Sequence, residues 1–328
     1  IMVTASKPTM VDIDNSLIAE PQYYFGKMHR TKVFYDKTSI SMDDLVARVN
    51  TDLQAGKSVL VVLNTKKCVK ECYDKLVNIR QSGIEYVFLT TDIIPITRLD
   101  RIESIRKCIG PQVVISTQLI EAGVDIDLDV VYRDIAPFDS IMQSAGRCNR
   151  NFRKDIGIVH VINLDNCKYA RQIYDHVLIE TSLRILGMYE EFDECQFLEI
   201  SDRYFNILKH KVIQDKDFMF SLYKLNYDDG NKAIDKFRII EDDDKSEVFV
   251  EIDQKAANVF KEFRALGFIK DIIERKKAFL KMKNRFLQYI IPINNKRLQK
   301  NPTQMVGELG YVPYSELPNY YNLITGYI

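Results

Sequence analysis

The sequence predicts an α/β fold, in which a parallel sheet is covered by helices on both faces and is followed by a smaller, mostly helical α+β domain. Between residues 32 and 164, short β-branched and apolar runs alternate with stretches of helical periodicity. After residue 166 this alternation stops and long helical stretches follow. With 328 residues, of which 46% are hydrophobic, the chain is long enough for two domains.

Six runs in the first part are predicted as strands: Thr31–Tyr35, Ser58–Leu63, Tyr86–Leu89, Gln112–Ser116, Val130–Arg133 and Gly157–Leu164. Helices are predicted between them. The first begins at Ser41, whose hydroxyl can cap it while Asp44 occupies the third helical position, and Gly56 ends it. The second covers Lys66–Ile79, and the third follows Pro95. The buried face of this third helix is predicted to consist of Leu99, Ile102, Ile105 and Ile109.

The second part is predicted to be mainly helical, with long stretches at Tyr169–Met188 and Gln254–Lys283. Two alternating runs, Lys236–Ile240 and Glu247–Ile252, flank the acidic residues 241–244 and predict an antiparallel hairpin with a solvent-facing turn. The aromatic residues of this part form either a docking surface or core, and helical spacing favours core. They are Tyr204, Phe205, Phe218, Phe220, Tyr223 and Tyr227.

Bulk composition does not demand a nucleic-acid partner, because 46 basic and 46 acidic residues give a net charge of zero. Any nucleic-acid site must therefore be local. The six cysteines include no CxxC pair, which favours a reducing compartment such as the cytosol, and no metal site is predicted. No apolar run is long enough to predict a membrane span.

The first segment with recognisable chemistry is ISTQLIEAGVDID, from Ile115 to Asp127. It follows an apolar strand, and the loops at the carboxyl ends of parallel strands form the ligand crevice of such a sheet. Ser116 and Thr117 offer hydroxyls and backbone N–H groups at a helix start, where phosphates bind. Gly123 permits close backbone approach, and Asp125 can accept hydrogen bonds from a ribose. A capped helix after any strand would explain this segment equally well.

The second segment is APFDSIMQSAGRCNRN, residues 136–151, which also follows an apolar strand. The spacing of Gln143, Arg147 and Arg150 predicts that all three lie on one helical face, which Gly146 keeps accessible. Two guanidinium groups beside a glycine suit the charge of a transferring γ-phosphoryl group. A solvated basic face is the alternative, but the spacing Q-x-x-G-R-x-x-R after a strand favours phosphate binding.

The two segments resemble motifs V and VI of superfamily 2 helicases. Over their full length they resemble the same motifs of the helicase–nuclease family of type I CRISPR interference. VTASKP, residues 3–8, is similar to motif III, and Asn64-Thr65 after the strand VLVVL is similar to motif IV. The ending YYNLITGYI is similar to the C-terminal tail of that family. The second segment departs from the pattern at Ser144, where superfamily 2 enzymes commonly have arginine. The resemblance is specific over residues 57–164.

This resemblance implies a RecA-like helicase lobe. Residues 1–25 would be the end of a first lobe with a linker, residues 26–166 the second lobe, and residues 167–328 an accessory domain. The implied enzyme uses ATP and Mg²⁺, with the metal held mainly by the first lobe. It is recruited by a crRNA-guided surveillance complex, pulls the displaced single-stranded DNA and degrades it. The implied partners are thus the first RecA-like lobe, an HD nuclease domain, single-stranded DNA and the surveillance complex.

The resemblance also implies roles for individual residues. Arg150 is the arginine-finger candidate, Arg147 also reaches the γ-phosphate, and Gln143 contacts nucleotide or DNA. The residues implied to shape the nucleotide side are Gly123 and Asp125, those to contact nucleic acid are Asn64, Thr65, Thr117 and Gln118, and those to couple the two lobes are Thr4 and Ser6.

Other motifs of such an enzyme do not occur in this sequence. Gly56-Lys57-Ser58 lacks the leading glycine of a phosphate loop and precedes a strand, and Asp193-Glu194-Cys195-Gln196 lacks the apolar strand that precedes a DExx box. No histidine is followed by aspartate, as the HD motif requires. We expect these parts upstream in a longer protein and expect the chain alone to be inactive. Two alternatives are an RNA-directed superfamily 2 helicase, which the wording of both segments disfavours, and a non-catalytic interaction module.

Overall fold

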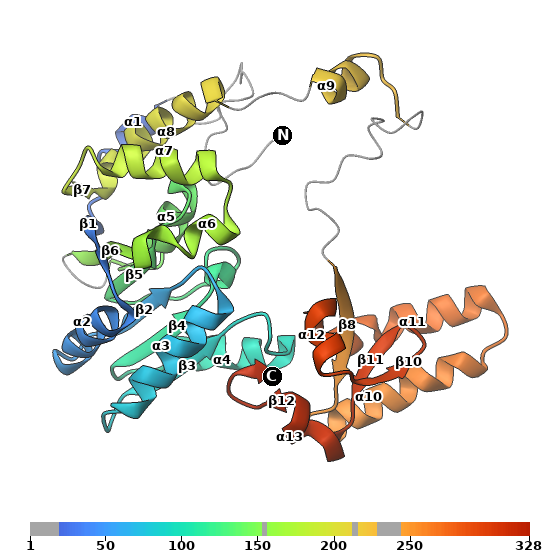
Figure 1. Cartoon of the computed structure of the whole chain (residues 1–328). Coiled ribbons are helices and arrows are strands. Elements are labelled where there is room, and N and C mark those ends of the chain that lie inside the picture. The colour runs from blue at the N-terminus through green and yellow to red at the C-terminus, as the bar shows by residue number, and fades with distance from the viewer. Residues whose placement is uncertain (1–19, 153–155, 212–215, 228–243) are drawn as a thin grey trace. The chain divides into compact units, whose positions relative to one another are not determined.

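The computed structural model describes residues 20–152, 156–211, 216–227 and 244–328, and the chain divides into two compact units (Figure 1). The first unit runs to Lys209 and also takes in Leu287–Tyr289 and Tyr321–Ile328. The second comprises His210–Phe286 and Ile290–Tyr320. Among the described residues, no helix combines the length and the apolar character that crossing a membrane requires.

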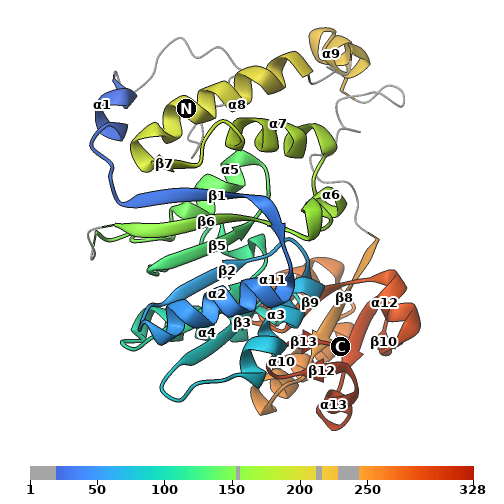
Figure 2. The same ribbon diagram turned by 60° about the vertical axis from the view of Figure 1, so that its left-hand side comes forward.

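The first unit is built on a seven-stranded sheet in the order β3-β4-β2-β5-β6-β1-β7 (Figure 2). Its strands are β1 (Thr31–Ile40), β2 (Val59–Val62), β3 (Glu85–Leu89), β4 (Gln112–Ser116), β5 (Val130–Asp134), β6 (Gly157–Leu164) and β7 (Glu191–Asp193). Strands β1 to β6 are parallel, and β7 pairs antiparallel with β1 at the edge. The six predicted strands are therefore confirmed. Every residue of β2, β4 and β5 is buried, as expected for a parallel sheet covered on both faces.

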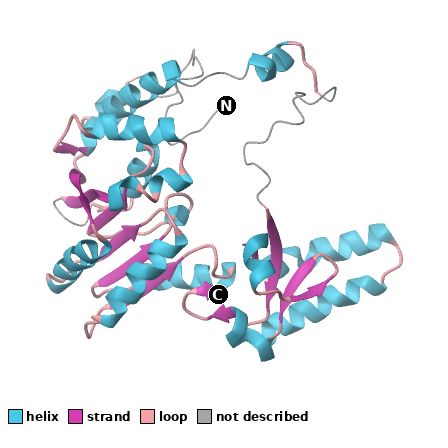
Figure 3. Ribbon diagram, viewed as in Figure 1, coloured by secondary structure: helices cyan, strands magenta, loops and turns pink. Residues whose placement is uncertain are grey.

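Helices cover both faces of this sheet (Figure 3). Alternate residues of each strand point to two separate cores, one shared with α2 (Met42–Gln54) and α3 (Lys66–Asn78). The other core is shared with α4 (Pro95–Lys107), α5 (Phe138–Ala145), α7 (His176–Leu186) and α8 (Phe197–Lys211). The predicted capping box at the start of α2 is present, since Asp44 N–H donates to Ser41 Oγ and Ser41 N–H donates to Asp44 Oδ2.

Three helical predictions need correction. Leu99 is mostly exposed within α4, and Ile109 is fully exposed, because α4 ends at Lys107 and the chain then turns extended. The stretch 169–188 is two helices, α6 (Ala170–Ile173) and α7, because the backbone is extended at Tyr174 and Asp175 caps α7. The stretch 254–283 is likewise two helices, α10 (Gln254–Ala265) and α11 (Ile272–Leu287).

The first unit continues past the domain boundary predicted after residue 166. Strand β7 extends the sheet, and Ile179, Ile200 and Tyr204 of the following helices are buried in the same core as α5. Tyr204 thus agrees with the prediction that the aromatic residues are core. Phe220, Tyr223 and Tyr227 are instead mostly exposed.

The chain end also belongs to the first unit. Its short antiparallel hairpin, β12 (Tyr321–Asn322) and β13 (Gly326–Tyr327), packs against the loop between β3 and α4. Tyr327 N–H donates to Asp92 O at 3.0 Å, and Arg101 donates to the carbonyl oxygens of Leu323 and Ile324 at 2.6 and 2.8 Å. Gly326 has φ +86°, and a Cβ there would lie 2.3 Å from Asp92 O. This position therefore requires glycine.

The second unit contains a four-stranded sheet in the order β10-β11-β8-β9. Its strands are β8 (Lys245–Val250), β9 (Ile290–Asn294), β10 (Gln304–Val306) and β11 (Leu309–Val312). The predicted strand at 247–252 corresponds to β8, which pairs with β9 and β11, while its predicted partner 236–240 lies outside the described residues. The remaining α-helices within the described residues are α1 (Pro21–Phe25), α9 (Lys216–Tyr223), α12 (Asn295–Lys300) and α13 (Leu317–Tyr320). Stacked aromatic rings form the core of the second unit, and the ring centroids of Phe260 and Tyr311 lie 3.9 Å apart.

A buried ion pair joins strand β5 to the segment that follows β4. The Arg133 side chain is fully buried, and its Nη2 lies 2.8 Å from Glu121 Oε1, whose side chain is 7% exposed. Burial alone would lower the pKa of Arg133, but Glu121, Tyr174 and Asp134 together hold it above its ordinary value. Arg133 is therefore charged inside the core. The Glu121 carboxylate beside it offsets the free-energy cost of burying that charge.

We predict that Arg133→Met lowers the free energy of unfolding by about 3–5 kcal/mol, because it leaves the Glu121 carboxylate buried without its partner. Adding Glu121→Leu should recover at least half of this loss, since packed apolar side chains replace a buried ion pair at little net cost. Urea unfolding followed by circular dichroism measures both. Tyr132→Phe is the control on the opposite face of β5; it removes one hydrogen bond to Asp52 and should cost about 1 kcal/mol. Equal losses in the single and the paired variant would contradict this account.

Candidate functional site

The predicted site residues lie at two opposite edges of the sheet. Asn64-Thr65 and Thr117-Gln118 follow β2 and β4 directly and occupy the carboxyl edge. Asp125 and Arg150 lie at the amino edge, where the chain leads into β5 and β6 and where Asp129 accepts a hydrogen bond from the Ser58 backbone N–H before β2. Helix α5 carries the chain from one edge to the other. The expectation that both segments share one crevice at the carboxyl edge is therefore wrong.

The carboxyl edge carries four of the predicted site residues, and their side chains differ in exposure. Asn64 is 2% exposed, and its amide donates to Asp134 Oδ2 at 2.7 Å and accepts from Arg133 at 2.7 Å. Thr117 is also buried, and its backbone N–H donates to Leu89 O. Thr65 and Gln118 are partly exposed, and the Thr65 hydroxyl caps α3. Of these four residues, Thr65 and Gln118 have the side chains that can reach a ligand here.

The arginine segment, residues 146–151, is not helical. Helix α5 ends at Ala145, and Asn149 has a positive φ of 44°. A strand-like bridge replaces the helix, because Leu128 N–H donates to Arg147 O at 3.1 Å and Asn149 N–H donates to Leu128 O at 2.9 Å. The prediction that Gln143, Arg147 and Arg150 lie on one helical face is therefore wrong.

The two arginines of this segment have different environments. Arg147 is 8% exposed, and its guanidinium donates to the backbone carbonyls of Ile120 and Glu121. Burial and the neighbouring Arg150 charge lower the pKa of Arg147. Arg150 has a side chain 37% exposed, and its Nε lies 2.7 Å from Oδ1 of the more exposed Asp125. Arg147 therefore holds the backbone in place, whereas Arg150 is accessible to a ligand.

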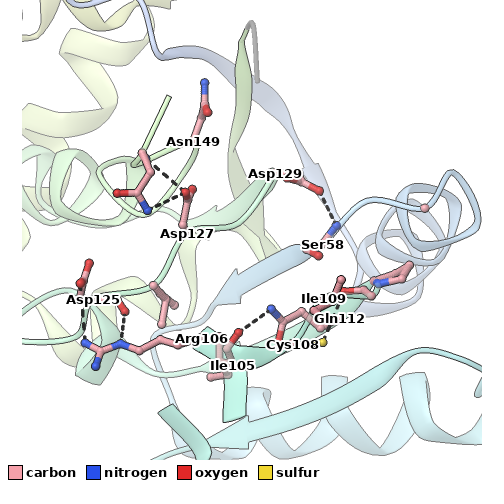
Figure 4. A pocket seen from close by; sticks show the side chains of 15 residues that line it. Ser58, Ile105, Arg106, Cys108, Ile109, Gln112, Asp125, Asp127, Asp129 and Asn149 are labelled. Atoms are coloured by element: carbon pink, nitrogen blue, oxygen red, sulfur yellow. Dashed lines mark hydrogen bonds and ion pairs between the residues drawn. The ribbon is translucent and has the colours of Figure 1, made fainter. Parts of the chain in front are cut away.

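A polar cavity of about 370 Å³ lies beside Asp125 (Figure 4). Arg106 Nε donates to the Asp125 backbone carbonyl at 2.6 Å, and Asp127 accepts from the backbone N–H of Arg150 at 2.8 Å. Asp125 and Asp127, which line the cavity, thus both contact Arg150 of the arginine segment. Gln143 lies in a different hollow of about 270 Å³, lined also by Phe25, Met28, Arg30 and Glu194.

Gly123 makes the turn that leads from Glu121 to Asp125. Its φ is +72°, and a Cβ added there would meet nothing within 4 Å. Glycine is required here by the left-handed backbone and not by lack of space. Thr4 and Ser6, with the rest of residues 3–8, lie outside the described residues.

Sequence reasoning missed three polar residues that organise the site. Arg133, Glu121 and Ser144 are all buried, and Ser144 Oγ lies 3.3 Å from Glu121 Oε1. The signal was present, because an arginine inside the apolar strand VVYRD must find a buried acceptor. Within the described ranges, no group of three or more His, Cys, Asp or Glu side chains is placed to hold a metal ion.

Comparison with known proteins agrees with the resemblance of the two segments. A family model described as the C-terminal part of the CRISPR-associated nuclease/helicase Cas3 matches residues 55–153. The Cas3 nuclease/helicase of Methanothermobacter thermautotrophicus is 27% identical over 196 residues, 58% of this chain and 22% of that protein. That of Haloferax volcanii is 64% identical over 42 residues, 13% of this chain and 4% of that protein. The chain matches less than a quarter of the length of these relatives.

Solved structures share the fold. T. fusca Cas3-AMPPNP superimposes with a TM-score of 0.58 at 12% identity, over 87% of this chain and 39% of that chain. A chain of a pre-nicking CRISPR RNA-guided surveillance complex superimposes with a TM-score of 0.54 at 11% identity, over 88% of this chain and 41% of that chain. Residues 55–153 are therefore similar to the helicase C-terminal region of Cas3 proteins, and the first unit shares its fold with solved Cas3 structures.

Proposed function

We propose that this chain supplies the second lobe of an ATP-dependent single-stranded DNA translocase, a helicase–nuclease that acts in CRISPR antiviral interference. The observation that carries the proposal is the accessible pair of Arg150 and Asp125, with 2.7 Å between Arg150 Nε and Asp125 Oδ1; Asp125 also lines a polar cavity. Such a guanidinium suits the phosphate chain of a nucleotide that another lobe grips.

Arg150 is the proposed arginine finger. An ion pair this exposed contributes little to stability, so exchanging Asp125 for a γ-phosphate costs little. The released Asp125 carboxylate can accept a hydrogen bond from a ribose hydroxyl. Arg147, whose guanidinium is committed to the carbonyls of Ile120 and Glu121, acts by holding the segment that carries Arg150.

The carboxyl edge is the proposed nucleic-acid side. Thr65 and Gln118 offer partly exposed polar groups, and Lys66 adds a cation 39% exposed beside them. Hydroxyl, amide and ammonium groups of this kind contact the phosphates and sugars of a strand without reading its sequence. Thr117 and Asn64 contribute through the backbone positions that they define.

The other parts of the proposal rest on the resemblance to Cas3 proteins. ATP with Mg²⁺ would be gripped by a first RecA-like lobe, and the metal would neutralise phosphate charge when bound. Thr4 and Ser6 would relay between the lobes. The HD nuclease domain and the crRNA-guided surveillance complex are the remaining proposed partners; the similar chain in a CRISPR RNA-guided surveillance complex supports the latter.

We predict that Arg150→Ala, in a protein that joins this chain to its first lobe, lowers the DNA-stimulated kcat by roughly 10³ to 10⁵. This equals about 4–7 kcal/mol in the activation barrier. Arg150→Lys should stay badly impaired, because a point charge lacks the planar fork. ATP affinity should change far less than kcat, since the finger acts on charge that develops in the transition state.

The matched control for this prediction is Arg171→Ala. Arg171 is exposed and pairs with Glu180 at 3.1 Å, so it resembles Arg150 in exposure and partner but lies in α6, outside the arginine segment. Steady-state kinetics of all variants measures kcat, and nucleotide titration measures ATP affinity. A kcat for Arg150→Ala within a few-fold of the control would make Arg150 a structural residue.

The chain by itself should not hydrolyse ATP, with or without DNA. Its sequence contains no phosphate loop after a strand and no DExx box after an apolar strand, which grip the phosphates and the metal. Phosphate release by purified chain, abolished in Arg150→Ala, would show that the chain is catalytic alone.

Single-stranded DNA should bind the chain weakly, because one lobe offers few phosphate contacts and the net charge is zero. Raising the salt concentration should weaken binding further. Gln118→Ala should reduce the affinity several-fold, whereas Gln81→Ala, a partly exposed glutamine elsewhere on the lobe, should not. Fluorescence titration with a labelled oligothymidylate measures this. Nanomolar binding at physiological salt would reveal a binding surface other than the carboxyl edge.

A further inference from the structure

A continuous chain of buried contacts runs between the two edges of the sheet. At the carboxyl edge, Arg133 Nη1 donates to Asn64 Oδ1 at 2.7 Å. At the centre, Arg133 Nη2 contacts Glu121 Oε1 at 2.8 Å. Toward the amino edge, Arg147 donates to the Glu121 backbone carbonyl. Gln118 is attached to the first of these contacts, since its Nε2 donates to Asn64 O at 3.4 Å.

Each member of this chain belongs to a different segment of the lobe. Asn64 follows β2, Glu121 lies between β4 and β5, Arg133 is in β5, and Arg147 is in the arginine segment. All four are 8% exposed or less, so water cannot replace a lost contact. If Asn64 moves, the other three side chains must move with it. Otherwise a buried polar group loses its hydrogen-bond partner.

We propose that Arg133 is a positioning residue that transmits nucleic-acid binding at the carboxyl edge to the arginine segment at the amino edge. This inference rests on the proposed function, because it needs a nucleic-acid side and a nucleotide side. Arg133 touches neither ligand. It acts through Asn64 on one side and through Glu121 and Arg147 on the other.

The competing explanation is that Arg133 and Glu121 only stabilise the core. The paired variant Arg133→Met with Glu121→Leu separates the two, because it keeps a packed interior but removes the directional contacts. Tyr132→Phe is the matched control. It alters the neighbouring residue of β5, which belongs to the other core and whose hydroxyl donates to the partly exposed Asp52.

The first experiment measures hydrogen–deuterium exchange of the chain alone with saturating oligothymidylate. The amides of residues 147–151 are hydrogen-bonded, so their exchange can be followed. In the wild type and in Tyr132→Phe, oligothymidylate should slow exchange at residues 64–66 and 117–118 and change it at 147–151. In the paired variant, the slower exchange at residues 64–66 and 117–118 should remain, and the change at residues 147–151 should disappear.

Every outcome of this experiment decides something. No response at the carboxyl edge of the wild type would overturn the proposed nucleic-acid side, and the coupling with it. A response there without any change at residues 147–151 would overturn the coupling alone. A paired variant that responds as the wild type does would show that Arg133 is not the link.

The second experiment measures ATP hydrolysis by a protein that joins this chain to its first lobe. The paired variant should lose about tenfold or more of its maximal stimulation by DNA, while its KM for ATP stays near the wild type and its thermal midpoint remains above the assay temperature. A purely structural role would move the thermal midpoint and leave the stimulation intact. Full stimulation in a folded paired variant would therefore overturn the proposal.

Discussion

The arrangement of the whole candidate site depends on one buried charge, the guanidinium of Arg133. Strand β5 lies in the middle of the sheet and is buried along its whole length, so a cation there must be surrounded by acceptors. Those acceptors come from Asn64, Glu121 and the phenol of Tyr174. Three separate segments are thereby held at set positions around one side chain.

The direction of the strands explains why such a link is useful. In a parallel sheet all strands end at one edge, so the residues that follow β2 and β4 meet there. Helix α5 then returns the chain to the opposite edge before Arg147 and Arg150. The two proposed ligand-facing regions lie on opposite edges of the sheet, and contacts that cross the interior join them.

Local sequence patterns predicted the elements of the lobe and missed what long-range contacts decide. The strands and the Ser41 cap follow from β-branched runs and side-chain capping, both of which act between neighbours in sequence. The arginine segment does not follow from such patterns, because the bridge between Leu128 and Cys148 ends the helical continuation. The C-terminal hairpin was also missed, since its conformation is determined by the Asp92 loop that it contacts.

The distinct environments of Arg147 and Arg150 follow from the same geometry. Once the segment leaves α5 it passes Glu121, and the first arginine is drawn inward to the carbonyls beside the Arg133 ion pair. The side chain of the second arginine stays partly exposed, and among the described residues it forms an ion pair with the exposed carboxylate of Asp125. A buried, multiply bonded guanidinium is costly to move, whereas an exposed ion pair exchanges partners readily. The lobe thus combines a buried arginine that holds the backbone with an exposed one, three residues later, that is the proposed ligand of an incoming phosphate.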